Sequence, residues 1–209
     1  MPRPTKYTTD VILEAALELT EAKGVDALTA RTLAAWLNCS TGPIFSRFES
    51  MEALHEVLME SIMEDFIARV AEESVGAPDP ILGAAIGWLG FAAGSPGLYE
   101  ALFLRRHAAH AGWGRVRMRI ATDLSHHERF ADRGPRELFG LVGRVAVVMH
   151  GLGLEVWAGR LSADDPEKLV RELVMPVLDA TEAHGWNDDL HSTHNPTNRR
   201  PAPHSPHTT

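Results

Sequence analysis

Apolar residues recur at helical spacing along most of this chain, and no segment shows the strict alternation of a half-buried strand. Between residues 54 and 70, for example, Leu54, Leu58, Ile62, Phe66 and Val70 are spaced by four. Residues at this spacing lie on one face of an α-helix, and without strands that face must be buried against other helices. The pattern therefore predicts an all-α fold with about nine helices.

The composition is that of a folded protein in a reducing compartment. The 209 residues are 44% hydrophobic, which is enough for a packed core, and Cys39 is the single cysteine, so no internal disulfide can form. The N-terminal residues lack the apolar core of a signal peptide. The most apolar stretch, 138–157, contains Arg144, His150 and Glu155, which a membrane span would tolerate poorly. We therefore expect a soluble, cytoplasmic protein in which this stretch is a buried helix.

Capping residues, glycines and prolines divide the helical pattern into segments. Thr8 or Thr9, Thr29, Ser40 and Ser50 are candidate N-caps. The expected helices lie between Thr8 and Gly24, from Thr29 to Leu37, and over 41–48, 51–74, 81–93, 98–110, 113–130, 136–160 and 166–184, the last kinked at Pro176. From Gly185 the composition shifts to His, Pro, Asn, Thr and Arg, so residues 185–209 are expected to form a disordered tail.

Residues 8–54 carry the most specific pattern in the chain. Two short helices separated by the tight connection Asn38-Cys39, the second one polar, are typical of a helix-turn-helix. In this motif the second helix enters the DNA major groove, so it keeps a few apolar anchors inward and shows small or polar side chains outward. Ile44 and Phe48 are the expected anchors. The side chains left for DNA are those of Thr41, Gly42, Phe45, Ser46 and Arg47.

The same segment resembles the TetR family of bacterial regulators, and the matching residues occur in order and without gaps. They are Ile12-Leu13-Glu14-Ala15-Ala16, Gly24, Leu28-Thr29-Ala30-Arg31, Leu33-Ala34, Ser40-Thr41-Gly42-Pro43-Ile44-Phe45 and Phe48-Glu49-Ser50-Met51-Glu52-Ala53-Leu54. The resemblance implies an all-α homodimer that binds double-stranded DNA at a palindromic operator, in most cases a repressor released by a small molecule. It implies a three-helix DNA-binding domain over 1–50, here called the head, and a larger ligand-binding and dimerisation domain over 51–184, here called the body.

The resemblance also assigns roles to matching positions. Thr29 and Arg31 would contact phosphates, and Thr41, Gly42 and Ser46 would face base edges or phosphates. The full set of expected DNA-binding residues is Arg3, Lys6, Thr29, Arg31, Ser40, Thr41, Gly42, Phe45, Ser46 and Arg47.

Two departures from the family pattern, together with the negative charge of the chain, reduce the expected electrostatic attraction to DNA. Phe45 stands where the family usually has a phosphate-contacting tyrosine, and Met51 stands where it usually has a phosphate-contacting lysine. Residues 1–50 carry five Lys and Arg against six Asp and Glu, and the whole chain has a net charge of −8. Because phosphate neutralisation supplies most non-specific affinity, we expect weak non-specific binding and a modest salt dependence.

In the body, aromatic and sulfur-containing residues of the middle helices predict a pocket for an apolar or aromatic effector. The expected lining is Trp88, Phe91, Phe103, Trp113 and Met149, together with Tyr99 and Met118, and the expected polar contacts are His107, Arg117 and His150. The homodimer is expected to form through 136–160 and 166–184, where glycines at 140, 143, 151 and 153 would permit close helix approach.

Other functions receive little support from the residues. The histidines lack the cysteine or carboxylate partners of a metal site, and no cofactor motif occurs. No nucleophile–base or paired-carboxylate arrangement occurs, so an enzyme is not expected. The remaining alternative is a helical small-molecule-binding protein whose DNA-binding head is weakened, as Phe45 and Met51 would suggest.

Overall fold

The computed structural model describes residues 6–75, 77–105 and 113–184, and all regular structure in these ranges is helical, as the sequence predicts. Arg3, His107 and the expected tail 185–209 lie outside the described residues. The head contains α1 (Thr9–Lys23), the 3-10 turn η1 (Val25–Ala27), α2 (Ala30–Trp36) and α3 (Gly42–Phe45). The body follows as α4 (Met51–Ser74), α5 (Pro80–Gly94), α6 (Pro96–Tyr99), η2 (Glu100–Leu104), α7 (Trp113–Ser125), η3 (Glu128–Phe130), α8 (Pro135–Trp157), α9 (Pro166–Leu173) and α10 (Met175–His184).

The helix starts follow local capping chemistry. The hydroxyl groups of Thr8, Thr29 and Ser50 accept backbone N–H groups at the starts of α1, α2 and α4, as predicted. Asp79 does the same for α5 by accepting the N–H of Ile81 at 2.9 Å. The prediction for Ser40 is wrong, because α3 begins after Thr41 and no side chain caps it.

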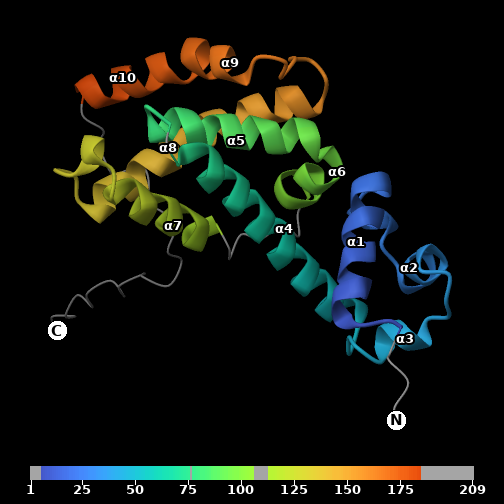
Figure 1. Cartoon of the computed structure of the whole chain (residues 1–209). Coiled ribbons are helices and arrows are strands. Elements are labelled where there is room, and N and C mark those ends of the chain that lie inside the picture. Colours follow the sequence, from blue (N-terminus) through green and yellow to red (C-terminus); the bar gives the residue numbers. More distant parts are fainter. Residues whose placement is uncertain (1–5, 76, 106–112, 185–209) are drawn as a thin grey trace, which may run out of the picture.

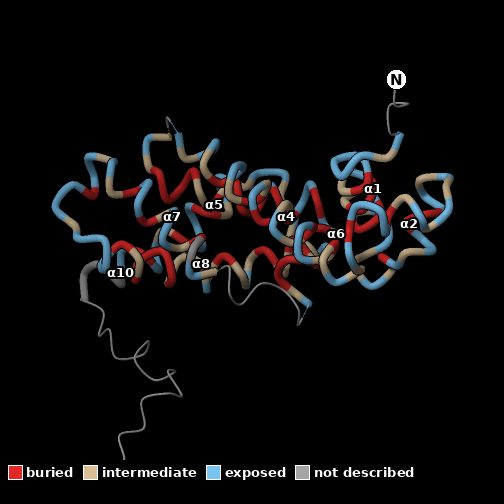
Figure 2. Tube along the Cα trace, turned by 90° about the horizontal axis from the view of Figure 1, so that it is seen from below, coloured by how far each residue is buried: buried red, intermediate tan, exposed pale blue. Residues whose placement is uncertain are grey.

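Helix α4 connects the two parts of the molecule (Figure 1). Its N-terminus lies beside α3, and its C-terminal half packs on α5. The predicted stripe of Leu54, Leu58, Ile62, Phe66 and Val70 is buried along its whole length, with at most 2% of each residue exposed. One face of this helix therefore contributes to the cores of both head and body, and Figure 2 shows buried segments in both parts of the molecule.

Glycines allow α5 to approach α4 at backbone distance. A Cβ at Gly83 would lie 2.2 Å from the Glu73 carbonyl oxygen, and one at Gly87 would lie 2.8 Å from the Arg69 carbonyl oxygen. Gly90, on the same helix, faces open space. The contact between α4 and α5 thus depends on the absence of side chains at Gly83 and Gly87.

Several helices differ from the predicted segments. The predicted 98–110 helix is replaced by the single turn α6 and the π-helical segment η2, which ends at Leu104. Helix α7 ends at Ser125 rather than at 130, and the chain resumes as the 3-10 turn η3. The last helix divides at Val174, as predicted from Pro176, whose ring nitrogen cannot donate to the preceding turn.

Helix α8 is long and apolar enough to cross a membrane, with a mean hydropathy of 1.5, and the bent pair of α5 with Pro96–Leu104 passes the same test together. Core helices of soluble proteins share these properties. In α8, Leu138, Leu141 and Met149 are fully buried, and the helix packs against α5 and α7. We therefore treat α8 as a core helix of the body.

The substitution Gly83→Ala is expected to lower the free energy of unfolding by about 1–3 kcal/mol, because the new methyl group must push α5 away from the α4 backbone. Gly90→Ala is the matched control. It should raise stability by about 0.5–1 kcal/mol, since alanine costs less conformational entropy in a helix and meets nothing there. Urea denaturation followed by circular dichroism would measure both, and equal effects at the two positions would contradict the packing argument.

Candidate nucleic-acid interface and internal cavity

The turn between α2 and α3 is built by residues suited to it. Thr29 and Thr32 form a reciprocal capping box at the start of α2, and the Thr32 hydroxyl also donates to the Ala27 carbonyl oxygen at 2.6 Å. After α2, Asn38 adopts a left-handed conformation with φ of 51°, which asparagine tolerates better than most residues. The Cys39 N–H then donates to the Ala34 carbonyl oxygen at 2.9 Å and closes the turn. The direction of α3 is therefore fixed by local backbone geometry.

Helix α3 is anchored on its inner side and open on its outer side. Ile44 is fully buried and Phe48 is 5% exposed, as the anchor prediction requires. Phe45 is 48% exposed, an unusual value for a phenylalanine. The described residues expected to bind DNA are all exposed except Thr41, which is half-buried: Lys6, Thr29, Arg31, Ser40, Thr41, Gly42, Phe45, Ser46 and Arg47. The geometry leaves them accessible, and their contact with DNA remains a prediction.

Two cationic groups of the head, Arg47 and Lys6, lie close to Tyr7. The Arg47 Nε donates to the carbonyl oxygen of Tyr7 at 3.3 Å, so the segment before α1 is held against the end of the recognition helix. The Lys6 Nζ lies 5.2 Å from the centroid of the Tyr7 ring. Arg47 retains further guanidinium donors for a phosphate. The Ser46 hydroxyl, in contrast, donates to the Pro43 carbonyl oxygen at 2.7 Å.

A second surface feature of the head was not anticipated from sequence. Trp36 at the end of α2 is 40% exposed, its Nε1 donates to a Glu18 carboxylate oxygen at 3.0 Å, and the Lys23 Nζ lies 5.4 Å from its ring. These contacts tie α2 to α1. They also place the ammonium group of Lys23, one of the few positive charges of the head, in an intramolecular contact.

A small cavity of about 30 Å³ lies in the body among α4, α5, α7 and α8. Four of the expected ligand-binding residues, Trp88, Trp113, Arg117 and Met149, are on its wall. The wall also contains aliphatic residues that were not expected to bind ligand: Val70, Ile81, Ala84, Ala85, Ile120, Leu124, Leu141, Val142, Val145 and Ala146. Apolar spacing in α4, α5, α7 and α8 could have indicated them, but it does not distinguish a cavity wall from a filled core.

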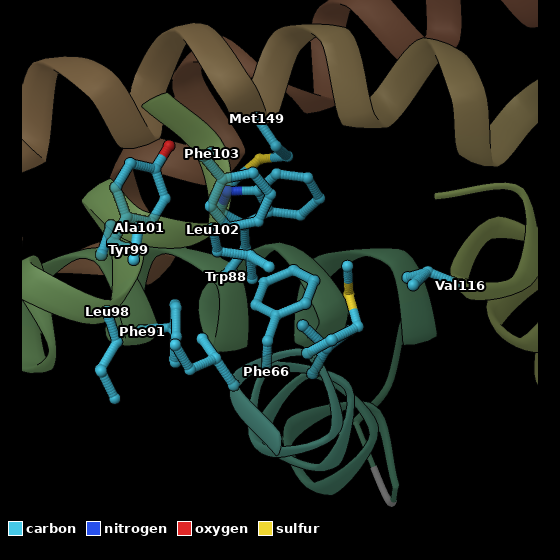
Figure 3. Packing of buried hydrophobic residues seen from close by; sticks show 14 of the residues in the cluster. Phe66, Trp88, Phe91, Leu98, Tyr99, Ala101, Leu102, Phe103, Val116 and Met149 are labelled. Atoms are coloured by element: carbon cyan, nitrogen blue, oxygen red, sulfur yellow. The ribbon is translucent and has the colours of Figure 1, made fainter. Parts of the chain in front are cut away.

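Four more of the expected residues, Phe91, Tyr99, Phe103 and His150, belong to an aromatic cluster beside the cavity, and Figure 3 shows the first three. Phe103 stacks on Trp88 with ring centroids 5.1 Å apart, and the His150 ring meets Phe103 edge-on at 5.6 Å. Phe91 meets Phe66 at 5.4 Å. These side chains are not on the cavity wall, although Phe103 contacts both Trp88 and Trp113, which are. Met118 is 47% exposed and is outside the cluster.

Two polar atoms are buried in this cluster. The Trp88 Nε1 and the Tyr99 hydroxyl lie against Gly153, where a Cβ would be 2.3 Å from the phenol oxygen, and neither has a well-formed hydrogen bond among the described residues. Burial raises the pKa of Tyr99 to about 12, and the adjacent Trp88 indole offsets part of the rise. Burial also lowers the pKa of His150, which favours its neutral form.

Head and body also meet directly. The Gly97 backbone lies on α1, where a Cβ would be 2.4 Å from the Glu21 carbonyl oxygen, and the Leu98 N–H donates to the Glu21 carboxylate at 3.0 Å. Arg105 bridges Asp26 of the head, at 2.8 Å, and Glu100 of the body. The Trp157 Nε1 donates to the Pro96 carbonyl oxygen at 3.0 Å. Helix α6 is therefore held between α1 and the end of α8.

Within the described ranges, no group of three or more His, Cys, Asp or Glu could hold a metal ion. Cys39 is a half-buried free thiol.

Comparison with known proteins agrees with this geometry. Residues 12–58 match the family model described as bacterial regulatory proteins, tetR family. No curated protein matches the chain significantly. A TetR-like transcriptional regulator from Rhodococcus sp. RHA1 has a TM-score of 0.54 at 15% identity, covering 89% of this chain and 100% of its own. A TetR transcriptional regulator from the same organism has a TM-score of 0.53 at 21% identity, covering 83% and 97%. At these identities the two structures establish a common fold.

Arg47→Ala is expected to lower affinity for an operator fragment at least about tenfold, roughly 1.4 kcal/mol, because it removes a phosphate contact and releases the segment at Tyr7. Arg119→Ala is the control, since Arg119 is exposed on α7 and pairs with Asp123 at 3.3 Å. A gel-shift titration would measure both. Unchanged affinity in Arg47→Ala would remove this residue from the interface.

The double substitution Phe45→Tyr with Met51→Lys is expected to strengthen binding to a labelled duplex of mixed sequence. The tyrosine hydroxyl adds about 0.5–1.5 kcal/mol of hydrogen bonding, and the lysine adds one phosphate contact. The plot of log affinity against log salt should steepen by about 0.9. Fluorescence anisotropy at several salt concentrations would measure the slope. A slope equal to that of the parent protein would mean that position 51 does not reach the backbone of DNA.

Proposed function

We propose that this chain, which belongs to the TetR family through its N-terminal domain, is a cytoplasmic, homodimeric repressor released from its operator by a small apolar molecule. The observation that carries the proposal is the helix-turn-helix of residues 12–58 with its recognition helix anchored by Ile44 and open to solvent at Phe45. The DNA-binding part follows from that motif. Ligand response, repression and the dimer are the further steps of the proposal.

Helix α4 supports a coupling between cavity and DNA. Its first turn is capped by Ser50, directly after α3, and its later residue Val70 is on the cavity wall. The 24 residues between its ends form one uninterrupted helix. A ligand that displaces the wall at Val70 would therefore tilt the end that carries the recognition helix.

The contact of Gly97 and Leu98 with Glu21 supports a second route. Tyr99 and Phe103, which follow this contact, belong to the aromatic cluster beside the cavity. A shift of that cluster would be passed to α1 through α6. By either route, a hundredfold loss of DNA affinity requires the ligand to favour the released conformation by about 2.8 kcal/mol.

The dimer is proposed to form through 136–160 and 166–184. Val147 on α8 is 73% exposed, and Leu173 and Val177 are 43% and 45% exposed, which leaves apolar side chains on these helices without partners in the subunit. The expected role of the glycines needs correction. Gly140, Gly143 and Gly153 are buried inside the subunit, where Gly143 faces Arg117 and Gly153 faces Tyr99, so Gly151 alone of the four is exposed.

A helical small-molecule-binding protein with a weakened DNA-binding head is the second candidate. The exposed phenyl ring of Phe45, the methionine at position 51 and the slight negative charge of the head favour it. The two candidates differ in whether the purified protein selects specific duplexes.

Selection of bound fragments from a pool of genomic DNA tests the proposed function. A repressor should enrich one or a few palindromic sequences, and the adjacent genes would indicate the effector. Arg47→Ala protein serves as the control and should lose the enrichment. A pool that stays unenriched with parent protein would favour the second candidate.

The paired substitution Val147→Glu with Val177→Glu is expected to convert the dimer to monomers, because two buried carboxylates would face their copies across the interface. Val75→Glu is the control, since Val75 is 82% exposed at the end of α4, outside the proposed interface. Sedimentation equilibrium would measure the molecular mass. A monomeric parent protein, or a paired variant that stays dimeric, would contradict the proposed interface.

A further inference from the structure

One charged side chain is on the wall of the cavity. Among the described residues that line it, Arg117 on α7 carries a charge, and the others are aliphatic side chains, alanines, a methionine and two tryptophans. An arginine in an apolar wall is costly unless a hydrogen-bonding counter-charge accompanies it. The surroundings of Arg117 therefore indicate what kind of molecule the cavity would accept.

The Arg117 guanidinium has one hydrogen-bond acceptor within the part of the chain that the structure describes. Its Nη2 donates to the Phe139 carbonyl oxygen at 3.2 Å, and its Cζ lies 4.1 Å from the centroid of the Phe139 ring. The Nε is buried and has no acceptor, and no described carboxylate pairs with this group. Burial lowers the pKa of Arg117, which expresses the same cost of desolvating the cation. Arg119, in contrast, pairs with Asp123.

Helix α8 leaves space for this cation. A Cβ at Gly143 would lie 2.3 Å from the Arg117 Nη2 and 2.8 Å from its Cζ, so any other residue there would displace the guanidinium. The neighbouring residues Val142 and Ala146 are on the cavity wall. The guanidinium therefore lies over α8 at the border of the cavity, in the space that Gly143 leaves, and contacts the Phe139 carbonyl oxygen and ring but no described carboxylate.

We propose that the cavity binds an apolar carboxylic acid whose carboxylate pairs with Arg117 and whose hydrocarbon or aromatic body lies among Trp88, Trp113 and Met149. The planar guanidinium matches a carboxylate, which would supply the acceptor that Nε lacks. The apolar wall would shield one side of the ion pair from water, since Arg117 is half-buried. The inference rests on the proposed function only in taking this cavity as the effector site. Because the cavity measures about 30 Å³, binding of such an acid would require its walls to move apart.

Isothermal titration calorimetry with matched acids and amides tests the inference. The probes are decanoate against decanamide, and 2-naphthoate against 2-naphthamide, which share a carbon skeleton and differ in the charge. The parent protein should bind each acid at least about tenfold more tightly than its amide, which corresponds to about 1.4 kcal/mol. Equal affinity for acid and amide, or no binding of either acid, would overturn the inference.

Variants test whether Arg117 causes the preference for the acid over the amide. Arg117→Met should reduce the acid affinity to that of the amide while changing the amide affinity less than about twofold, and Arg119→Met should retain the full preference. Gly143→Ala keeps the charge but displaces the guanidinium, and should also weaken acid binding; it decides the outcome if Arg117→Met fails to fold. Acid preference that survives both Arg117→Met and Gly143→Ala would overturn the assignment.

Failure of the inference about acid binding can be distinguished from failure of the proposed function. Acids that bind through Arg117 without releasing operator DNA would contradict the proposed ligand response and leave the cavity assignment intact. Neutral compounds that release DNA while the acids do not bind would support ligand response and overturn the inference about the acid.

Discussion

The close approach of helix backbones at three glycines sets the arrangement of the molecule. Gly83 and Gly87 bring α5 onto α4, and Gly97 brings α6 onto α1. Through these contacts the body has two fixed attachments, one to the helix that leads to the recognition helix and one to the first helix of the head. Neither α4 nor α1 can keep its place if α5 or α6 moves, since backbone atoms cannot yield as a flexible side chain can.

The parts of the fold that depend on neighbours in sequence were predictable. The caps at Thr8, Thr29 and Ser50 and the buried stripe of α4 follow from short-range chemistry and a fixed period. The contacts of the glycines were not predictable, because a glycine in a helix gives no sign of which distant backbone or side chain it will meet. The expected role of Gly143 and Gly153 in the dimer was wrong for this reason. The wide turn of η2 was missed because apolar spacing alone does not separate an α-helix from a π-helix.

The candidate sites likewise combine features that the sequence predicts with features that it does not. The anchors of α3 and the exposure of its outer residues follow from a motif with few possible geometries. In the body, the sequence identified buried aromatic residues but could not divide them between cavity wall and core. Trp88 and Trp113 are on the wall, whereas Phe91 and Phe103 fill the core beside it. That division depends on where side chains from four helices leave a gap, which is a property of the assembled body.

The small volume of the cavity determines which conformation a ligand would favour in the proposed mechanism. A pocket that was equally large in both conformations would bind an effector without shifting the equilibrium between them, since equal affinity for both conformations changes nothing. Here the cavity measures about 30 Å³, so a ligand of many atoms would favour a conformation in which the helices have separated. The free energy of that separation lowers the affinity for the ligand. The same separation is the structural difference between the two conformations. Helices α4 and α6 would transmit it to the head, through Val70 and Gly97.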